Sequence, residues 1–110
     1  METLSRKTCV PCEGGALPLS REQAQMYLAQ TPFWSMKADA KSISRELKRK
    51  DFKEAMVFVN KAADIAEKEG HHPDISVHDY KYVSLTLSTH AIGGLSENDF
   101  ILAAKIDRII

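Results

Sequence analysis

The clearest pattern of apolar and polar positions lies in residues 52–69, where apolar side chains recur every three or four residues. This spacing predicts an amphipathic helix with one buried face. Gly70 follows directly and suits the end of a helix, because glycine adopts the left-handed conformation without steric cost. The apolar positions expected on the buried face are Phe52, Ala55, Met56, Val59, Ala63 and Ala66.

Two shorter segments also favour helices. Ser20 and Gln23 have the spacing of a capping box at the start of the first helix, which Thr31-Pro32 is expected to end. Ser96 is expected to cap the second, which begins after the glycine pair at residues 93–94. The chain therefore carries a helix near each end and a longer one between them.

The segments between these helices favour strands. Extended chain begins at residues 33–36, residues 43–48 alternate loosely, and residues 75–77 and 82–89 read as two further strands. The element order is α-β-β-α-β-β-α. Short strands with short links predict an α+β two-layer domain, in which three helices pack on one face of a four-stranded antiparallel sheet.

With 110 residues the chain is expected to form one domain, over residues 18–110. Residues 1–17, which contain Pro11 and two glycines, are expected to be a flexible tail. Cys9 and Cys12 form a single C-x-x-C there, and ordinary thiols are the favoured interpretation because a structural zinc site needs four ligands. So few cysteines favour a reducing, cytoplasmic location.

Charge and hydropathy exclude two classes of partner. Fifteen Lys and Arg residues balance fifteen Asp and Glu residues, so no excess of positive charge points to nucleic acid. No apolar stretch approaches the roughly 20 residues that span a bilayer. We expect neither a nucleic-acid partner nor a membrane partner.

Three of the four histidines fall near predicted ends of elements. His71 and His72 follow the long helix, and Pro73 biases His72 towards extended backbone. His90 ends the last predicted strand, on its polar face with Ser88. Because imidazole titrates near neutrality, these side chains suit proton transfer, although each taken alone is more often a surface residue.

Other polar residues accompany the histidines. Glu67 precedes His71 by four positions, so that a shared helical face would let its carboxylate orient the imidazole; a solvated charge is the alternative. Asp99 stands three residues after Ser96, where helix capping is as plausible as a functional role. Tyr80 suits packing better than hydrogen bonding.

Taken together, these residues resemble the signature of the pterin-4a-carbinolamine dehydratases. The resemblance covers about residues 18–108, and its fixed positions are Glu67, His71, His72, Pro73, Tyr80, His90 and Asp99. The family fold it implies agrees with the element order above. One departure concerns the strand before Asp51, where the family has two aromatic residues and this chain has Leu47 and Arg49.

The resemblance implies dehydration of 4a-hydroxytetrahydrobiopterin to quinonoid dihydropterin and water, which recycles tetrahydrobiopterin after an aromatic amino acid hydroxylase has used it. In this reaction a ring nitrogen of the pterin expels the hydroxyl, an acid of the protein protonates the departing oxygen, and a base of the protein removes a proton from a ring nitrogen. Because the substrate supplies its own electron pair, neither a metal nor an organic cofactor is implied. His71 and His90 would be acid and base, in an order left open, and His72 would bind the pterin. Supporting roles fall to Glu67, Pro73, Tyr80 and Asp99. A homodimer or homotetramer is implied.

Three alternatives stay open. Some members of the family also act as dimerisation cofactors of a homeodomain transcription factor, which makes a non-catalytic binding module the main rival. A second rival is a metal protein that uses His71, His72 and His90 as ligands. A third is the same chemistry on another pterin, or a role in molybdopterin-related metabolism.

Overall fold

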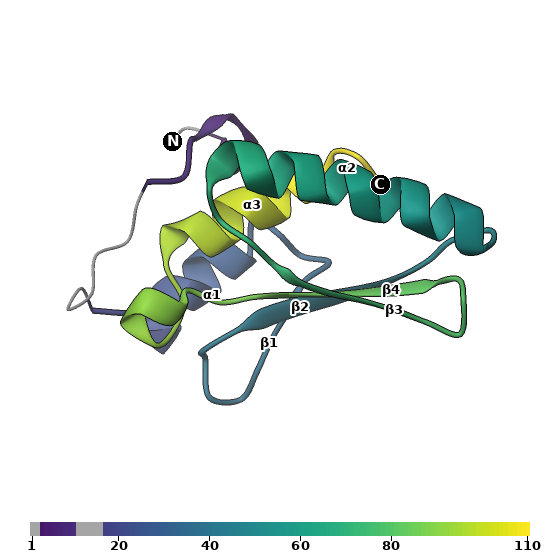
Figure 1. Cartoon of the computed structure of the whole chain (residues 1–110). Helices are drawn as coiled ribbons and strands as arrows, with labels where there is room; N and C mark the ends of the chain where they lie inside the picture. Colours follow the sequence, from purple (N-terminus) through teal and green to yellow (C-terminus); the bar gives the residue numbers. More distant parts are fainter. Residues whose placement is uncertain (1–2, 11–16) are drawn as a thin grey trace.

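The computed structural model describes residues 3–10 and 17–110, and within them it shows the α+β order expected from the sequence (Figure 1). A short 3₁₀ turn precedes the first helix and another follows the last strand. The elements are η1 (Leu4–Arg6), α1 (Arg21–Leu28), β1 (Ser35–Met36), β2 (Ile43–Lys48), α2 (Phe52–Glu69), β3 (Asp74–His78), β4 (Tyr82–Leu87), η2 (His90–Ile92) and α3 (Glu97–Asp107).

The four strands form one antiparallel sheet in the order β1-β2-β4-β3. The helices lie on one face of this sheet, so that the predicted two-layer architecture is confirmed (Figure 1). Alternation along β4 turns Val83, Leu85 and Leu87 towards the helices, and all three are fully buried. Central strand β4 therefore carries the middle of the core.

Helix α2 buries a stripe that differs from the one expected. Phe58 and Ala62 are buried, whereas Phe52 is 55% exposed. Apolar residues cover more of the surface of α2 than β4 and α3 can bury. Packing against these two elements therefore decides that the stripe with Phe58 is the buried one. The predicted helix end is confirmed, because Gly70 adopts a left-handed φ of 67°.

The predicted helix caps are also confirmed. Ser20 and Gln23 form a reciprocal capping box at the start of α1, and Ser96 forms one with Asp99 at the start of α3. At the opposite end of α1, the last helical residue is Leu28, so the helix ends before Thr31. These local hydrogen bonds explain why both helices begin where the sequence predicts.

Strand β4 is shorter than predicted. It ends at Leu87 instead of Thr89, and Thr89 makes only an isolated bridge to Gly94. His90 consequently begins η2 and does not continue the polar face of the strand. At its other end β4 is joined to β3 by a three-residue turn in which Asp79 and Tyr80 both have positive φ.

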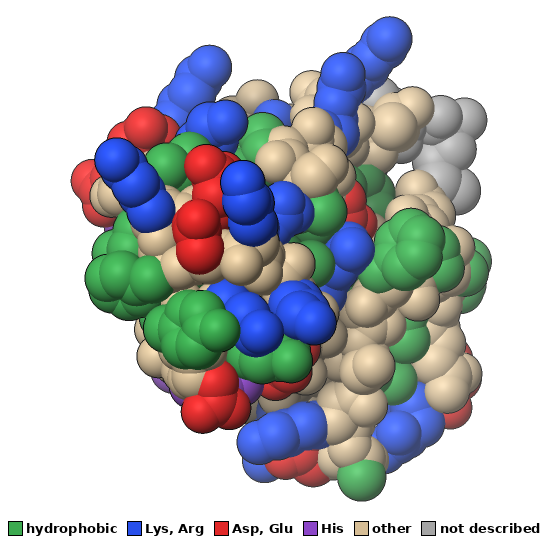
Figure 2. All heavy atoms as spheres, turned by 90° about the vertical axis from the view of Figure 1, so that its right-hand side faces the viewer, with side chains coloured by type: hydrophobic (Ala, Val, Ile, Leu, Met, Phe, Trp, Pro, Cys, Tyr) green, Lys and Arg blue, Asp and Glu red, His purple; other side chains and the backbone are tan. Residues whose placement is uncertain are grey.

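The two residues that depart from the family pattern, Leu47 and Arg49, both make contacts within the fold. Leu47 is buried in the core, and the Arg49 guanidinium lies 5.3 Å from the centre of the Phe58 ring. Figure 2 looks onto the end of the molecule where α2 begins and the β3–β4 turn lies. Hydrophobic side chains are interspersed there with Lys and Arg, and Phe52 and Tyr80 are among the exposed large hydrophobic residues of these two elements.

The described part of the expected tail, residues 3–10, packs on α3. Leu4 is only 3% exposed, and Lys7 Nζ lies 2.8 Å from Glu97 Oε2. Cys12, the second cysteine of the C-x-x-C, lies outside the described residues. Within the described part of the chain, no helix has the length and apolar character needed to cross a membrane.

Candidate active site

The β3–β4 hairpin brings the three histidines singled out in the sequence to one end of the sheet. Asp74 at the start of β3 pairs with Thr86 near the end of β4, so the residues before β3 lie beside those after β4. Gly70 turns the chain from α2 into this link. His71, His72 and His90 line one pocket of about 270 Å³.

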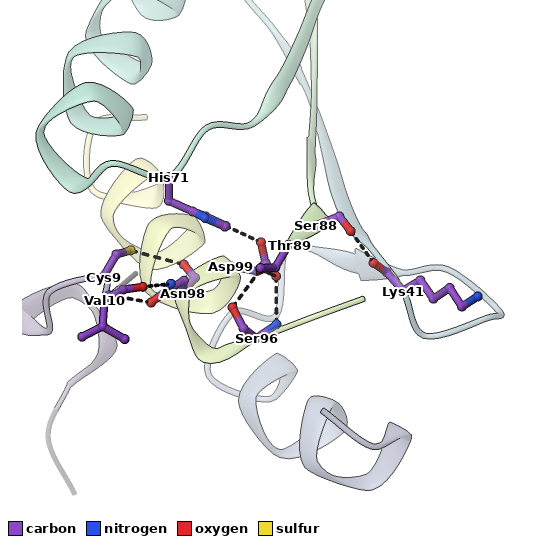
Figure 3. A network of polar contacts seen from close by, with 9 residues as sticks. All are labelled: Cys9, Val10, Lys41, His71, Ser88, Thr89, Ser96, Asn98 and Asp99. Atoms are coloured by element: carbon purple, nitrogen blue, oxygen red, sulfur yellow. Dashed lines mark hydrogen bonds and ion pairs between the residues drawn. The ribbon is translucent and has the colours of Figure 1, made fainter. Parts of the chain in front are cut away.

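His71 is held by a buried carboxylate (Figure 3). Its Nε2 lies 2.6 Å from Asp99 Oδ1, and the side chains are 12% and 0% exposed. The ring points from the end of α2 towards the start of α3 (Figure 3). An ionised carboxylate can only accept, so this contact assigns the hydrogen to Nε2 and leaves Nδ1 as the free ring nitrogen.

Asp99 is itself fixed by two further donors. Its Oδ2 accepts from the Thr89 hydroxyl at 2.8 Å and from the Ser96 backbone N–H at 3.0 Å. Because Thr89 gives its only hydroxyl hydrogen to Asp99, the 2.8 Å contact between the Thr89 and Ser96 hydroxyls has Ser96 as donor. The two interpretations of Asp99 are therefore compatible, since one oxygen caps α3 and the other holds His71.

Glu67 contacts a different histidine from the one expected. Its Oε1 lies 2.8 Å from His72 Nε2, whereas His71 turns to Asp99. The helical spacing argument fails because α2 ends at Glu69 and the left-handed Gly70 redirects the chain before His71. The Glu67 and His72 side chains are 78% and 61% exposed, so solvent screens this pair strongly.

His90 approaches the pocket from the opposite side of the hairpin. It is exposed, it begins η2, and its ring makes no hydrogen bond to the described residues. His71 and His90 are thus presented to one pocket from the links that flank β3 and β4. This arrangement offers a bound molecule two imidazoles, of which one can take a proton and the other can donate one.

Two sequence candidates have little or no part in the pocket. Pro73 lies in the link after His72 but does not line the pocket. Tyr80 occupies the β3–β4 turn, six residues after Asp74 at the start of the hairpin, and therefore lies on the order of 15–20 Å from the pocket end. It is 58% exposed and lies beside Lys81, whose Nζ is 5.3 Å from the ring centre.

The pocket also has residues that sequence reasoning missed. Val10 and Asn98 line it, and Thr89 both lines it and holds Asp99. The position of Asn98 in the first turn of α3, next to Asp99, was the one available signal for it. Nothing in the local pattern around Val10 indicated a contact, because it depends on how residues 3–10 fold back on α3.

A thiol lies behind the pocket wall. Cys9 is buried, and burial together with the Glu69 carboxylate raises the pKa of its thiol from 9.0 to about 12. The thiol therefore stays protonated and serves as a small packing group. Among the described residues, no three His, Cys, Asp or Glu side chains are grouped so that they could hold a metal ion.

Comparison with known proteins places this arrangement in a family. The model of the family described as pterin 4 alpha carbinolamine dehydratase matches residues 17–109. A protein of Halorhodospira halophila, named as a candidate pterin-4-alpha-carbinolamine dehydratase, is 50% identical over 107 residues, which are 97% of each chain.

Solved structures agree. A structure from Brucella melitensis, described as a transcriptional coactivator/pterin dehydratase, has 34% identity and a TM-score of 0.77, and the match covers 84% of this chain and 97% of that one. A pterin dehydratase-like protein, described as a RuBisCO assembly factor of the alpha-carboxysome, shares the fold at 21% identity and a TM-score of 0.58, over 69% and 87% of the two chains. The chain therefore belongs to the pterin 4 alpha carbinolamine dehydratase family, a family of hydro-lyases.

Proposed function

We propose that this protein dehydrates 4a-hydroxytetrahydrobiopterin to quinonoid dihydropterin and water, and so recycles the pterin that an aromatic amino acid hydroxylase has used. The observation that carries the proposal is the pairing of His71 with the buried Asp99 in the pocket that His90 also lines. The pocket is small, and its lining combines three histidines with Ser88, Thr89 and Asn98, which can form hydrogen bonds with a bicyclic heterocycle rich in nitrogen and oxygen.

His71 is proposed as the base and His90 as the acid. Asp99 occupies Nε2 of His71, so Nδ1 has the lone pair that takes a proton from a ring nitrogen of the pterin. His90, whose ring is unpaired among the described residues, gives a proton to the departing 4a-hydroxyl. The ring nitrogen beside carbon 4a supplies the electron pair that expels water, and each proton transfer contributes roughly 10²–10⁴-fold.

The other features of the proposal follow from this chemistry. His72, oriented by Glu67, binds the pterin. No metal or organic cofactor takes part, because the substrate supplies its own electron pair, and activity is expected to survive dialysis against a chelator. We also propose a cytoplasmic homodimer or homotetramer, which sedimentation at several concentrations would distinguish from a monomer.

The test is dehydration of freshly generated 4a-hydroxytetrahydrobiopterin, followed by ultraviolet absorbance. Wild type is expected to exceed the buffer rate, and His71→Ala and His90→Ala are each expected to lower kcat by roughly 10²–10⁴-fold. His78→Ala is the matched control, because His78 lies on β3 outside the pocket and this variant is expected to keep full activity. Wild-type turnover in both of the first two variants would defeat the proposal.

A second candidate is a non-catalytic binding module. This candidate is supported by the Brucella melitensis protein, which is described as a transcriptional coactivator as well as a pterin dehydratase. A folded wild-type protein that does not accelerate dehydration, yet binds a helical partner equally well before and after His71→Ala, would support this candidate. Loss of turnover in that variant, with rapid wild-type dehydration, would support the enzyme.

A further inference from the structure

The N-terminal segment formed by residues 3–10 reaches from the far side of α3 to the pocket. Leu4 anchors it in the core, and Lys7 pairs with Glu97. The Cys9 N–H donates to Glu69 Oε1 at 2.9 Å, and the Cys9 Sγ lies 3.6 Å from the backbone oxygen of Asn98. This segment is therefore held at several points along its length.

The last contact before the pocket is a two-sided clamp on Val10 (Figure 3). The Val10 N–H donates to Asn98 Oδ1 at 3.0 Å, and Asn98 Nδ2 donates back to the Val10 carbonyl. A carboxamide is the side chain that can satisfy both backbone groups at once. Asn98 is only 4% exposed, so little water competes for these hydrogen bonds.

The clamp leaves the Val10 side chain 65% exposed at the pocket wall. A single exposed valine needs no explanation on an ordinary surface. This valine differs because its backbone is fixed by a buried residue and because it is, with Ala91, one of two apolar side chains in a lining that carries three histidines. Apolar contacts with a few placed polar groups are what a small-molecule site requires.

We propose that Val10 packs against the bicyclic ring of the bound pterin and that Asn98 is the positioning residue that holds it there. This inference rests on the proposed function and names a part of the binding site that lies outside the histidine motif. Asn98 and its neighbour Asp99 occupy the same turn of α3. Asn98 holds Val10 and Asp99 holds His71, so the first turn of α3 fixes the position of Val10 relative to the proposed base.

Val10→Ala is the first test. Each carbon removed from a buried contact is worth a factor of about four in binding, and Val10→Ala removes two carbons, so we expect the KM for dehydration to rise about fifteenfold. We expect the dissociation constant of biopterin, an oxidised pterin that cannot dehydrate, to rise equally when measured by its fluorescence. Neither kcat nor its pH profile should change. Val57→Ala is the matched control, since Val57 is also exposed but lies on α2 outside the pocket.

Asn98→Ala tests the clamp. We expect the same rise in KM together with faster hydrogen exchange at the Cys9 and Val10 amides, and bound biopterin should slow that exchange in the wild type. If the wild type dehydrates the pterin while Val10→Ala and Asn98→Ala leave KM and biopterin binding unchanged, the proposed contact of Val10 with the pterin is wrong and the proposed function stands. If the wild type neither binds biopterin nor dehydrates its substrate, both fall.

Discussion

The two ends of the β3–β4 hairpin each hold a histidine beside a carboxylate, but in different surroundings. At the pocket end His71 meets Asp99 with side chains 12% and 0% exposed. Towards the turn, His78 Nε2 lies 3.3 Å from Glu46 Oε2 with side chains 43% and 56% exposed. A histidine therefore lies beside a carboxylate once under the helices and once on the open face of the sheet.

The difference lies in what else fixes the carboxylate. Asp99 accepts from Thr89 and from the Ser96 N–H, so its position is determined even without His71. Glu46 accepts from Ser84, which also contacts His78, but all three groups face water. A buried, fully satisfied network holds a ring in one orientation, whereas an exposed pair is screened and mobile. The first arrangement suits catalysis and the second does not.

Asp99→Asn is expected to have the largest effect. The amide cannot accept from His71, Thr89 and Ser96 in the way that the carboxylate does, so the wrong tautomer of His71 is favoured. We expect kcat to fall by roughly 10²–10⁴-fold and the free energy of unfolding to fall by about 1–3 kcal/mol. Steady-state dehydration and urea unfolding measure these losses, and unchanged kcat would show that burial of this pair does not matter.

Cys9, which lies near Asp99 behind the pocket wall, sharpens the comparison through pH. The pKa of its thiol is raised from 9.0 to about 12 in the folded protein, whereas in the unfolded chain it is near 9.0. Below pH 9 both states keep the proton and stability is complete. Between pH 9 and 12 the unfolded state loses its proton first, so this contribution declines as pH rises.

Urea unfolding at pH 8 and pH 10 checks this prediction. The wild type should lose more stability between the two pH values than Cys9→Ala, a variant that removes the titrating group while other groups titrate equally. In a Cys12→Ser background, Cys9 should also resist a thiol reagent at pH 8. An equal pH dependence in both proteins, or rapid modification, would contradict a buried protonated thiol.

Glu67→Gln is expected to have a smaller effect. The change from carboxylate to amide matches Asp99→Asn, but Glu67 and His72 are exposed and the pair is worth little. We expect kcat to stay within about threefold of wild type and the unfolding free energy to change by less than about 0.5 kcal/mol. A loss comparable to that of Asp99→Asn would mean that His72 takes part in proton transfer.

Glu46→Gln should have the smallest effect. It removes the charge from the exposed cluster with His78 and Ser84, which lies outside the pocket. We expect unchanged kcat and KM and a change in unfolding free energy below about 0.5 kcal/mol that disappears at high salt. A clear loss of activity would show that the open face of the sheet contributes to function.

Local signals in the sequence determined most of the elements and the pair of neighbouring histidines. The capping boxes at Ser20 and Ser96 and the glycine at residue 70 depend on hydrogen bonds and backbone geometry within a few residues, so they can be read from the chain. The grouping of His71 with His90 followed from the resemblance to a family, and the register of the β3–β4 hairpin explains it.

Only the tertiary structure decided which side chains of the candidate site are in contact with one another. Helical spacing assigned Glu67 to His71, but the left-handed Gly70 turned His71 towards Asp99, and no pattern within α2 encodes that change of partner. The same holds for the stripe that α2 buries and for the contact of Val10 with Asn98. Contacts between distant segments depend on how whole elements pack, because burial, and not spacing, chooses among the partners that the local chain permits.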